Sequence, residues 1–210
     1  NAGFVWVPLI IAVTVAAWFG MNDLSSANAS FSEQAVIFKR KHNWLMCWLY
    51  LATFGSFIGF AAAFPLLIKH SFPDVNALKF AFLGPFVGAL MRPLGGWVAD
   101  KLGGARVTLW NFVLMIAAVF GVIHFLPQDG GAGSFYGFLT MFMLLFVTTG
   151  IGNGSTFRMI PVIFRTLHEG WSAGKGAAAK ELASKAAGKE SAAVLGFTSA
   201  IGAFGAFFIP

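Results

Sequence analysis

The sequence predicts an all-α protein that crosses a membrane several times. Of its 210 residues, 58% are hydrophobic and only 10% are charged, and the mean hydropathy is +0.77. A soluble domain carries about 25% charged residues. Several apolar runs follow one another, each long enough to cross a bilayer as a helix. Because these runs lack the alternation of apolar and polar residues seen in transmembrane barrels, helices are the expected spanning elements.

Six spans are expected, and the last continues to the final residue of the sequence. They cover residues 4–20, 44–68, 77–99, 107–126, 135–164 and 191–210. We expect a tight charged turn at 100–106, a flexible turn at 127–134 and a polar, partly helical loop at 165–190. The chain begins with Asn1 rather than Met, and Pro210 ends an apolar run, so we interpret it as a piece of a longer protein. No cleavable signal peptide is predicted.

The charges of the connections predict the orientation of the spans. Connections 21–43, 100–106 and 165–190 contain ten basic residues, whereas the other two contain Lys69, with Lys79 just inside the next span. Basic residues concentrate on the cytoplasmic side of membrane proteins. The three basic connections are therefore expected to be cytoplasmic in a multi-pass cell-membrane protein. The ten residues are Lys39, Arg40, Lys41, Lys101, Arg106, Arg165, Lys175, Lys180, Lys185 and Lys189.

Several classes of function are disfavoured. The net charge of +6 lies mainly in the connections, so it indicates membrane topology and not nucleic-acid binding. Cys47 is the only cysteine, which excludes an intramolecular disulfide. The four histidines lack partners at metal-ligand spacing, and no nucleophile–base pair or phosphate loop is present. We therefore expect no metal, no cofactor and no enzymatic activity.

Arg92 lies deep in the third apolar run. It precedes Asp100 by eight residues, about 12 Å along a helix, which is too far for easy snorkelling to the interface. A charged side chain at the bilayer centre costs at least about 2.5–3.5 kcal/mol. The usual remedy is a carboxylate on a neighbouring helix, but none of the eight acids lies in the middle of an apolar run. This arrangement favours an anionic cargo as the partner of Arg92.

Glycine pairs and small residues indicate close helix contacts. Gly84 with Gly88, and Gly150 with Gly154, are spaced to let two membrane helices approach each other. The last span carries small residues on nearly every face. These small residues have two interpretations, which are tight helix packing alone or packing that also exposes backbone amides to a small ligand.

A short motif at the end of the third span resembles the loop motif of the major facilitator superfamily. Its residues are Gly96, Asp100, Lys101, Gly103 and Arg106, with Gly104 in place of one later basic residue. Asp100 is expected to meet the positive end of the next helix or a nearby cation, and such a contact can latch one conformation. The alternative is a generic charged turn.

Four stretches occur in an order that resembles the nitrate/nitrite porter family of this superfamily. They are residues 50–60, 84–100, 150–157 and 196–205, and the similarity covers essentially the whole chain. The resemblance implies helices six to eleven of a twelve-helix bundle. Residues 1–22 would be the last helix of the N-terminal half, 23–43 the cytoplasmic linker, and 44–210 an incomplete C-terminal half-bundle of five spans.

The resemblance also implies roles for individual residues. Arg92 would hold the anion, Tyr50 would donate a hydrogen bond to it, and Phe54 would form an aromatic wall. Tyr50 and Phe54 are four apart, on one side of a helix, although each alone could be ordinary packing. Arg158 is expected to snorkel to the cytoplasmic face. The last span would be the second nitrate signature, with Ala206 where the family often has glycine; its residues are Gly196, Ser199, Ala200, Gly202 and Gly205.

The implied function is secondary transport of nitrate and nitrite by alternating access. Exchange of the two anions is preferred, because these spans contain no acid that would carry a proton. The alternatives are nitrate–proton symport, transport of another small anion, or, from a different class, an anion channel or a membrane anion sensor. The expected partners are the two anions, the bilayer and the missing parts of the same protein, with no nucleic acid.

Overall fold

The computed structural model describes residues 4, 6–22, 30–128 and 133–208. Parts of three expected segments lie outside these ranges, namely 23–29 of the linker, 129–132 of the turn and 209–210 of the last span. The chain divides into two compact units, 1–33 and 34–210, each of which is described by itself.

In the first unit, α1 (Trp6–Gly20) is an apolar helix of 15 residues without a buried side chain, shorter than the other candidate spans. The four-residue α2 (Phe31–Gln34) crosses the boundary between the units.

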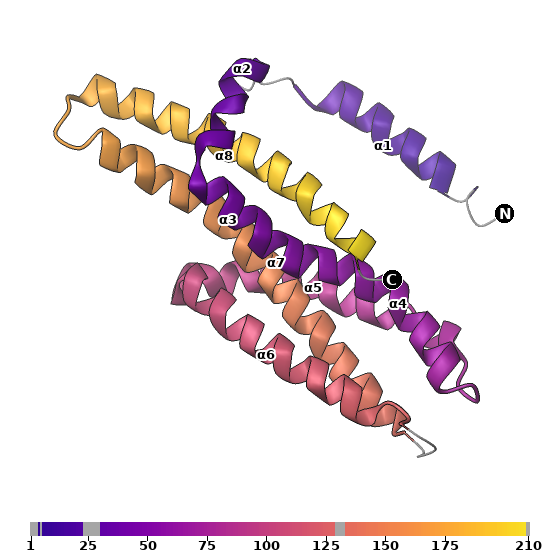
Figure 1. The fold of residues 1–210 in the computed structure, drawn as a ribbon. Helices are drawn as coiled ribbons and strands as arrows, with labels where there is room; N and C mark the ends of the chain where they lie inside the picture. Colours follow the sequence, from indigo (N-terminus) through magenta and orange to yellow (C-terminus); the bar gives the residue numbers. More distant parts are fainter. Residues whose placement is uncertain (1–3, 5, 23–29, 129–132, 209–210) are drawn as a thin grey trace. The chain divides into compact units, whose positions relative to one another are not determined.

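The second unit is a bundle of long apolar helices (Figure 1). Five helical segments of the described chain are long and apolar enough to cross a membrane, at 41–71, 77–102, 104–125, 135–171 and 177–207. In chain order the elements are η3 (Ala35–Lys39), α3 (Lys41–Tyr50), the π-helical turn η4 (Leu51–Gly55), α4 (Ser56–Ser71), η5 (Ala77–Lys79), α5 (Leu83–Leu102), α6 (Gly104–Phe125), α7 (Phe135–Trp171), α8 (Ala177–Phe204) and η6 (Gly205–Phe208).

Two expected connections are shorter than predicted. The turn at 100–106 is reduced to Gly103, because α5 continues to Leu102 and α6 begins at Gly104. Gly103 has a φ of 89°, a conformation that favours glycine. The expected loop at 165–190 is almost entirely helical, since α7 continues to Trp171 and α8 begins at Ala177. Alanine and lysine are strong helix formers, and they extend α8 beyond its apolar part.

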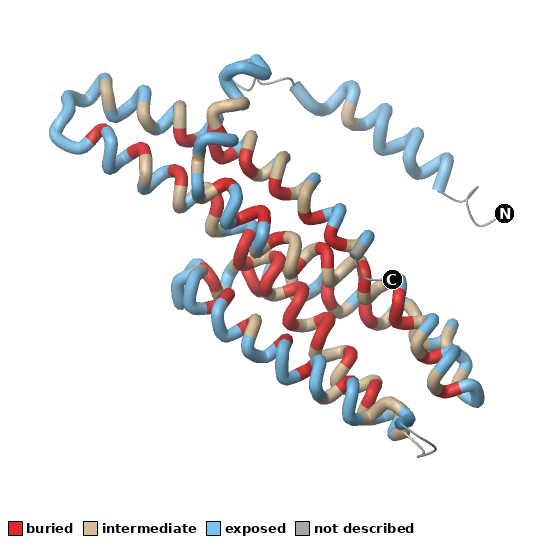
Figure 2. The backbone as a smooth tube through the Cα atoms, in the orientation of Figure 1, coloured by how far each residue is buried: buried red, intermediate tan, exposed pale blue. Residues whose placement is uncertain are grey.

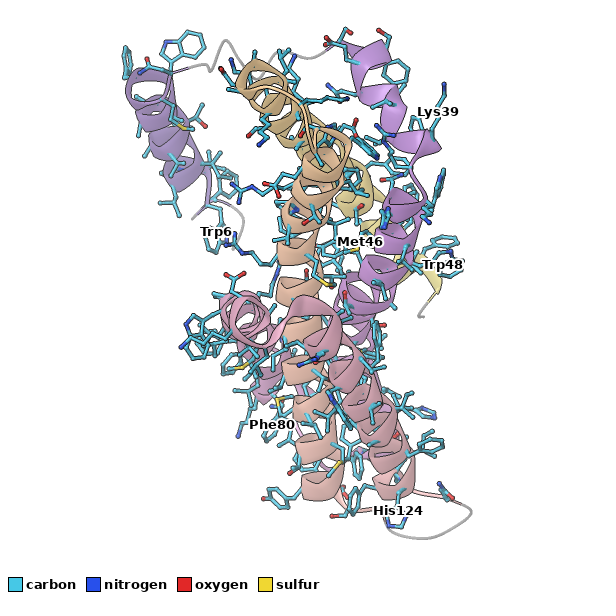
Figure 3. All side chains as sticks on the ribbon, turned by 90° about the vertical axis from the view of Figure 1, so that its left-hand side faces the viewer. Trp6, Lys39, Met46, Trp48, Phe80 and His124 are labelled. Carbon is cyan, nitrogen blue, oxygen red and sulfur yellow. The ribbon has the colours of Figure 1, made fainter. Side chains whose placement is uncertain are left out.

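The core of the second unit follows α7. Buried residues lie along α7 and on the helix faces that turn toward it (Figure 2). One cluster is aromatic, with Phe64 of α4 packed on Phe142 at 4.8 Å between ring centroids. A second cluster joins Met46 of α3 to α7 and α8. Trp48 lies on the outer side of α3 (Figure 3), as expected for a side chain in contact with lipid.

Helices α5 and α7 pack closely through glycines. A Cβ added at Gly95 would lie 2.6 Å from the Cα of Ile151, and one at Gly150 would lie 3.1 Å from the backbone carbon of Gly88. Backbone carbonyls of each helix therefore approach the other helix directly. This is the close contact that the two glycine pairs predict, with Gly95 as a further member.

A partly buried ion pair joins the start of α3 to α8. The Arg40 side chain donates from Nε and Nη2 to the Glu190 carboxylate at 3.0 and 2.8 Å. The same guanidinium lies 4.5 Å from the ring of Trp171 at the end of α7. The hydrogen bonds from Arg40 and the charge of Glu190 raise the pKa of Arg40 further above its usual value. This contact fixes the cytoplasmic ends of three helices relative to one another.

The fold places the basic connections at one end of the second unit. The α5–α6 junction and the α7–α8 turn lie at the same end, opposite the end of α6 and the start of α7 (Figure 1). Lys39 and His124 lie at opposite ends (Figure 3). Since basic residues concentrate on the cytoplasmic side, this common end is the one that the loop charges predict to be cytoplasmic. At about 1.5 Å per residue, the 37 residues of α7 measure about 55 Å, so α7 extends beyond the bilayer core.

Candidate functional site

Arg92, Tyr50 and Phe54 lie together, although 42 residues separate the first two. Nη2 of Arg92 donates a hydrogen bond to the hydroxyl oxygen of Tyr50, at 3.4 Å. The guanidinium carbon is 5.4 Å from the centroid of the Phe54 ring, within the range of a cation–π contact. The Tyr50 and Phe54 rings are 5.1 Å apart and inclined by 31°. We call these three residues the Arg92 site.

Within the described part of the chain, the Arg92 site contains a cation without a protein counter-ion. Among the residues that the structure describes, Arg92 forms no ion pair. The side chains that contact it are a phenol and an aromatic ring, neither of which neutralises its charge. Arg92 is half-buried, and Tyr50 is only 2% exposed. An arginine stays charged even when buried, so this cation has capacity for an anionic ligand.

A π-helical turn separates Tyr50 from Phe54. The sequence analysis placed both residues on one α-helical face, whereas residues 51–55 form the π-helical η4. The two rings are nevertheless adjacent. Gly55 in this turn meets the end of α8 and the start of η6, because a Cβ there would lie 3.1 Å from the carbonyl oxygen of Gly202 and 2.6 Å from the Cα of Gly205. Single π-helical turns inside α-helices are frequent at functional sites, and this one brings the aromatic pair against α8.

The signature residues of α8 and η6 divide into two groups. A Cβ added at Gly202 would lie 2.5 Å from Cδ1 of Tyr50 and 3.3 Å from Cδ1 of Phe54, so only glycine leaves room for both rings. Ser199 is a polar neighbour of the Tyr50 side chain. Gly205 meets Gly55. In contrast, Gly196 has open space around it, and Ala200 is exposed.

Phe157 of α7 is an aromatic neighbour of the site that the sequence analysis did not assign. Its ring centroid is 5.7 Å from that of Tyr50, and 37% of its surface is exposed. It is the last residue of the stretch 150–157, which the sequence analysis used for the family resemblance without giving Phe157 a role. Its position one helical turn after Asn153 was not enough to indicate contact with Tyr50.

The motif at the α5–α6 junction is built around an ion pair. Nε of Arg158 donates to both carboxylate oxygens of Asp100, at 2.7 and 3.0 Å. Arg158 therefore has a protein partner at the cytoplasmic end of α5, which the prediction of simple snorkelling missed. Lys101 lies 4.2 Å from the centroid of the Trp97 ring, and Arg106 is exposed in the first turn of α6. Gly96 lies at ordinary contact distance from α7.

Curated proteins similar to this chain are nitrate/nitrite transporters. The nitrate/nitrite transporter NarU of Salmonella typhimurium is 55% identical over 213 residues, which cover 100% of this chain and 45% of the relative. NarU of Escherichia coli is 54% identical with the same coverage. The probable nitrate/nitrite antiporter NarK2 of Thermus thermophilus is 36% identical over 99% of this chain and 42% of the relative. The chain thus spans a little under half the length of these relatives. No protein-family profile matches it.

Proposed function

Because the chain belongs to the nitrate/nitrite porter family of the major facilitator superfamily, we propose that it supplies the C-terminal part of the anion site of a nitrate/nitrite transporter. The names of the relatives support these substrates and a role other than an enzyme. Their length supports a second half of the bundle outside this sequence. The five membrane-length helices of the second unit agree with a multi-pass protein of the bacterial inner membrane.

The observation that carries the proposal is the unneutralised Arg92 against Tyr50 and Phe54. Without a protein carboxylate, the guanidinium within the membrane is stabilised best when an anion binds. Its planar donors match two oxygens of a nitrate or nitrite ion. The Tyr50 hydroxyl lies 3.4 Å from Arg92 and can donate a further hydrogen bond to an oxygen of the same anion. Aromatic rings bound the site and favour a small, flat ligand over a bulky one.

Exchange of nitrate for nitrite is the mechanism that we propose. A matching arginine from the other half would face Arg92, so that closure of the empty site brings two cations together. A bound monoanion relieves that repulsion and permits the two halves to rock around it. In the described part of the chain no acid contacts Arg92, which supports exchange over proton symport.

Counterflow of labelled nitrate tests this function. The full-length protein that contains this chain is reconstituted in liposomes loaded with nitrite, and labelled nitrate is added outside. We expect uptake that depends on internal nitrite and does not respond to a pH gradient. Arg92→Lys should abolish it, because lysine keeps the charge but loses the planar donor pair.

Liposomes loaded with chloride are the control, and they should show no counterflow. Uptake that follows the proton gradient would replace exchange with symport. Full activity in Arg92→Lys would show that Arg92 is structural and would remove the central argument for the site.

A further inference from the structure

Two asparagines inside the second unit lack hydrogen-bond partners. Asn43 of α3 and Asn153 of α7 are both 0% exposed. In the part of the chain that the structure describes, neither the amide oxygen nor the amide nitrogen of either residue has a partner. Buried polar groups in folded proteins almost always bind another protein group or an ordered water. Because a buried amide without a partner raises the free energy of the protein, each asparagine requires a physical explanation.

Asn153 lies next to the Arg92 site. It precedes Phe157 by four residues, so the two side chains leave α7 on the same face, and the ring of Phe157 packs on Tyr50. Its chain neighbour Gly154 packs against the backbone of Arg92. The Asn153 amide is therefore on the side of α7 that faces Tyr50, at the depth of Arg92 in the bundle.

The π-helical turn η4 packs against the same part of α7. Gly152, which directly precedes Asn153, meets this turn, because a Cβ there would lie 2.7 Å from the methyl group of Thr53. The hydroxyl of Thr53 is fully buried and donates to the carbonyl oxygens of Leu49 and Tyr50, at 3.1 and 3.4 Å. The hydroxyl and carbonyl groups of this turn are thus paired with one another and leave the neighbouring amide without a partner.

Asn43 provides an internal comparison. It precedes Tyr50 by seven residues on the same face of α3, about 10 Å along the helix at 1.5 Å per residue. It follows Arg40, whose guanidinium pairs with Glu190 at the other end of this face. The two asparagines therefore share residue type, burial and lack of a partner, but only Asn153 adjoins the Arg92 site.

We propose that Asn153 is a positioning residue of the anion site, whose amide donates to a backbone carbonyl of residues 49–53 when an anion binds. This inference rests on the proposed transport function. Tyr50 directly precedes the π-helical turn and Phe54 lies in it, so an anion in the Arg92 site acts on both. A ligand favours the arrangement in which the protein gains interactions. The hydrogen bond from Asn153 therefore strengthens anion binding without touching the anion.

The test compares apolar variants of the two asparagines in the purified full-length protein. The Kd for nitrate is measured by titration calorimetry, and Tm is measured in detergent without nitrate. Asn153→Leu keeps the branch at Cγ and removes both polar atoms of the amide. It should raise the Kd for nitrate about fivefold, because one hydrogen bond between neutral groups is lost when the anion binds. Its Tm should not fall, since the variant removes an unpartnered polar group from the core.

Asn43→Leu is the matched control, because it removes an equally buried amide that also lacks a partner. It should keep the wild-type Kd for nitrate. Leucine is larger than asparagine, so Asn153→Ala and Asn43→Ala separate loss of the amide from overpacking. Asn153→Ala should weaken nitrate binding as much as Asn153→Leu does, whereas Asn43→Ala should leave it unchanged.

The wild-type Kd in both Asn153 variants would overturn the inference while the wild type still binds nitrate. If Tm also falls in Asn153→Leu, the amide holds a structural water and has no role in anion binding. Equal weakening in the Asn43 and Asn153 variants would show a general effect of buried amides and would overturn the inference too. Absence of nitrate binding in the wild type would overturn the proposed function and this inference together.

Discussion

At the scale of single residues, Tyr50 links the arginine of the site to the signature helix. Its hydroxyl accepts from Nη2 of Arg92, while its ring packs against Gly202 and Phe157. The phenol is thus positioned by three helices before any ligand binds. A preorganised donor loses little freedom when the anion arrives, which favours binding.

Tyr50→Phe should weaken nitrate binding without disturbing the fold. The ring keeps its packing, but the contact with the charged Arg92 and with the ligand is lost. A hydrogen bond to a charged group contributes about 1.5–3 kcal/mol, so the KM for nitrate should rise about tenfold or more. The measurement is nitrate exchange in liposomes at several nitrate concentrations.

Tyr136→Phe provides the control, because Tyr136 is the other tyrosine of the chain and is 78% exposed. It should exchange nitrate with the wild-type KM. A Tyr50→Phe variant that also keeps the wild-type KM would reduce Tyr50 to a packing residue.

At the scale of helices, the contact between α5 and α7 positions Arg92. Gly95 follows Arg92 by three residues, on nearly the same face of α5, and meets the backbone of Ile151. Gly154 of α7 in turn lies against the backbone of Arg92 itself. The depth and direction of the arginine therefore depend on how closely these two helices approach.

Gly95→Ala should destabilise the protein, whereas Gly96→Ala should not. The added methyl at position 95 would lie 2.6 Å from a backbone atom of α7, while the nearest atom to one at position 96 is 3.8 Å away. Overpacking typically costs about 1–3 kcal/mol. Thermal unfolding of the purified full-length variants in detergent should show a lower Tm only for Gly95→Ala. Equal Tm values for the two variants would contradict the close contact described here.

At the scale of the whole molecule, the apolar runs were sufficient to predict the helical membrane fold, and the connections that the loop charges assign to one side do lie at one end of the second unit. Hydrophobic length identifies a span, and the basic connections identify its cytoplasmic end, because both effects act locally along the chain. The cytoplasmic extension of α7 and α8 was underestimated for the same reason. Residues 177–190 are polar, so hydropathy alone does not recognise them as part of a helix.

Contacts between distant residues could be predicted only in part. The approach of Arg92 to Tyr50 and Phe54 followed from a family resemblance, and their roles as ligands stay predictions. The Asp100–Arg158 pair joins residues 58 apart, and the π-helical turn at 51–55 contains Gly55, which meets the distant Gly205. Neither leaves a local pattern in the sequence, since each is determined by how the helices pack.

The central claim is that Arg92 binds the transported anion, and a nitrate titration tests it most directly. Isothermal titration calorimetry of the purified full-length protein should show nitrate binding to the wild type. Arg92→Lys should weaken that binding at least about tenfold, because a bidentate contact becomes a single point charge. Identical binding curves for the two proteins would contradict the account, since the anion would then be held without the guanidinium of Arg92.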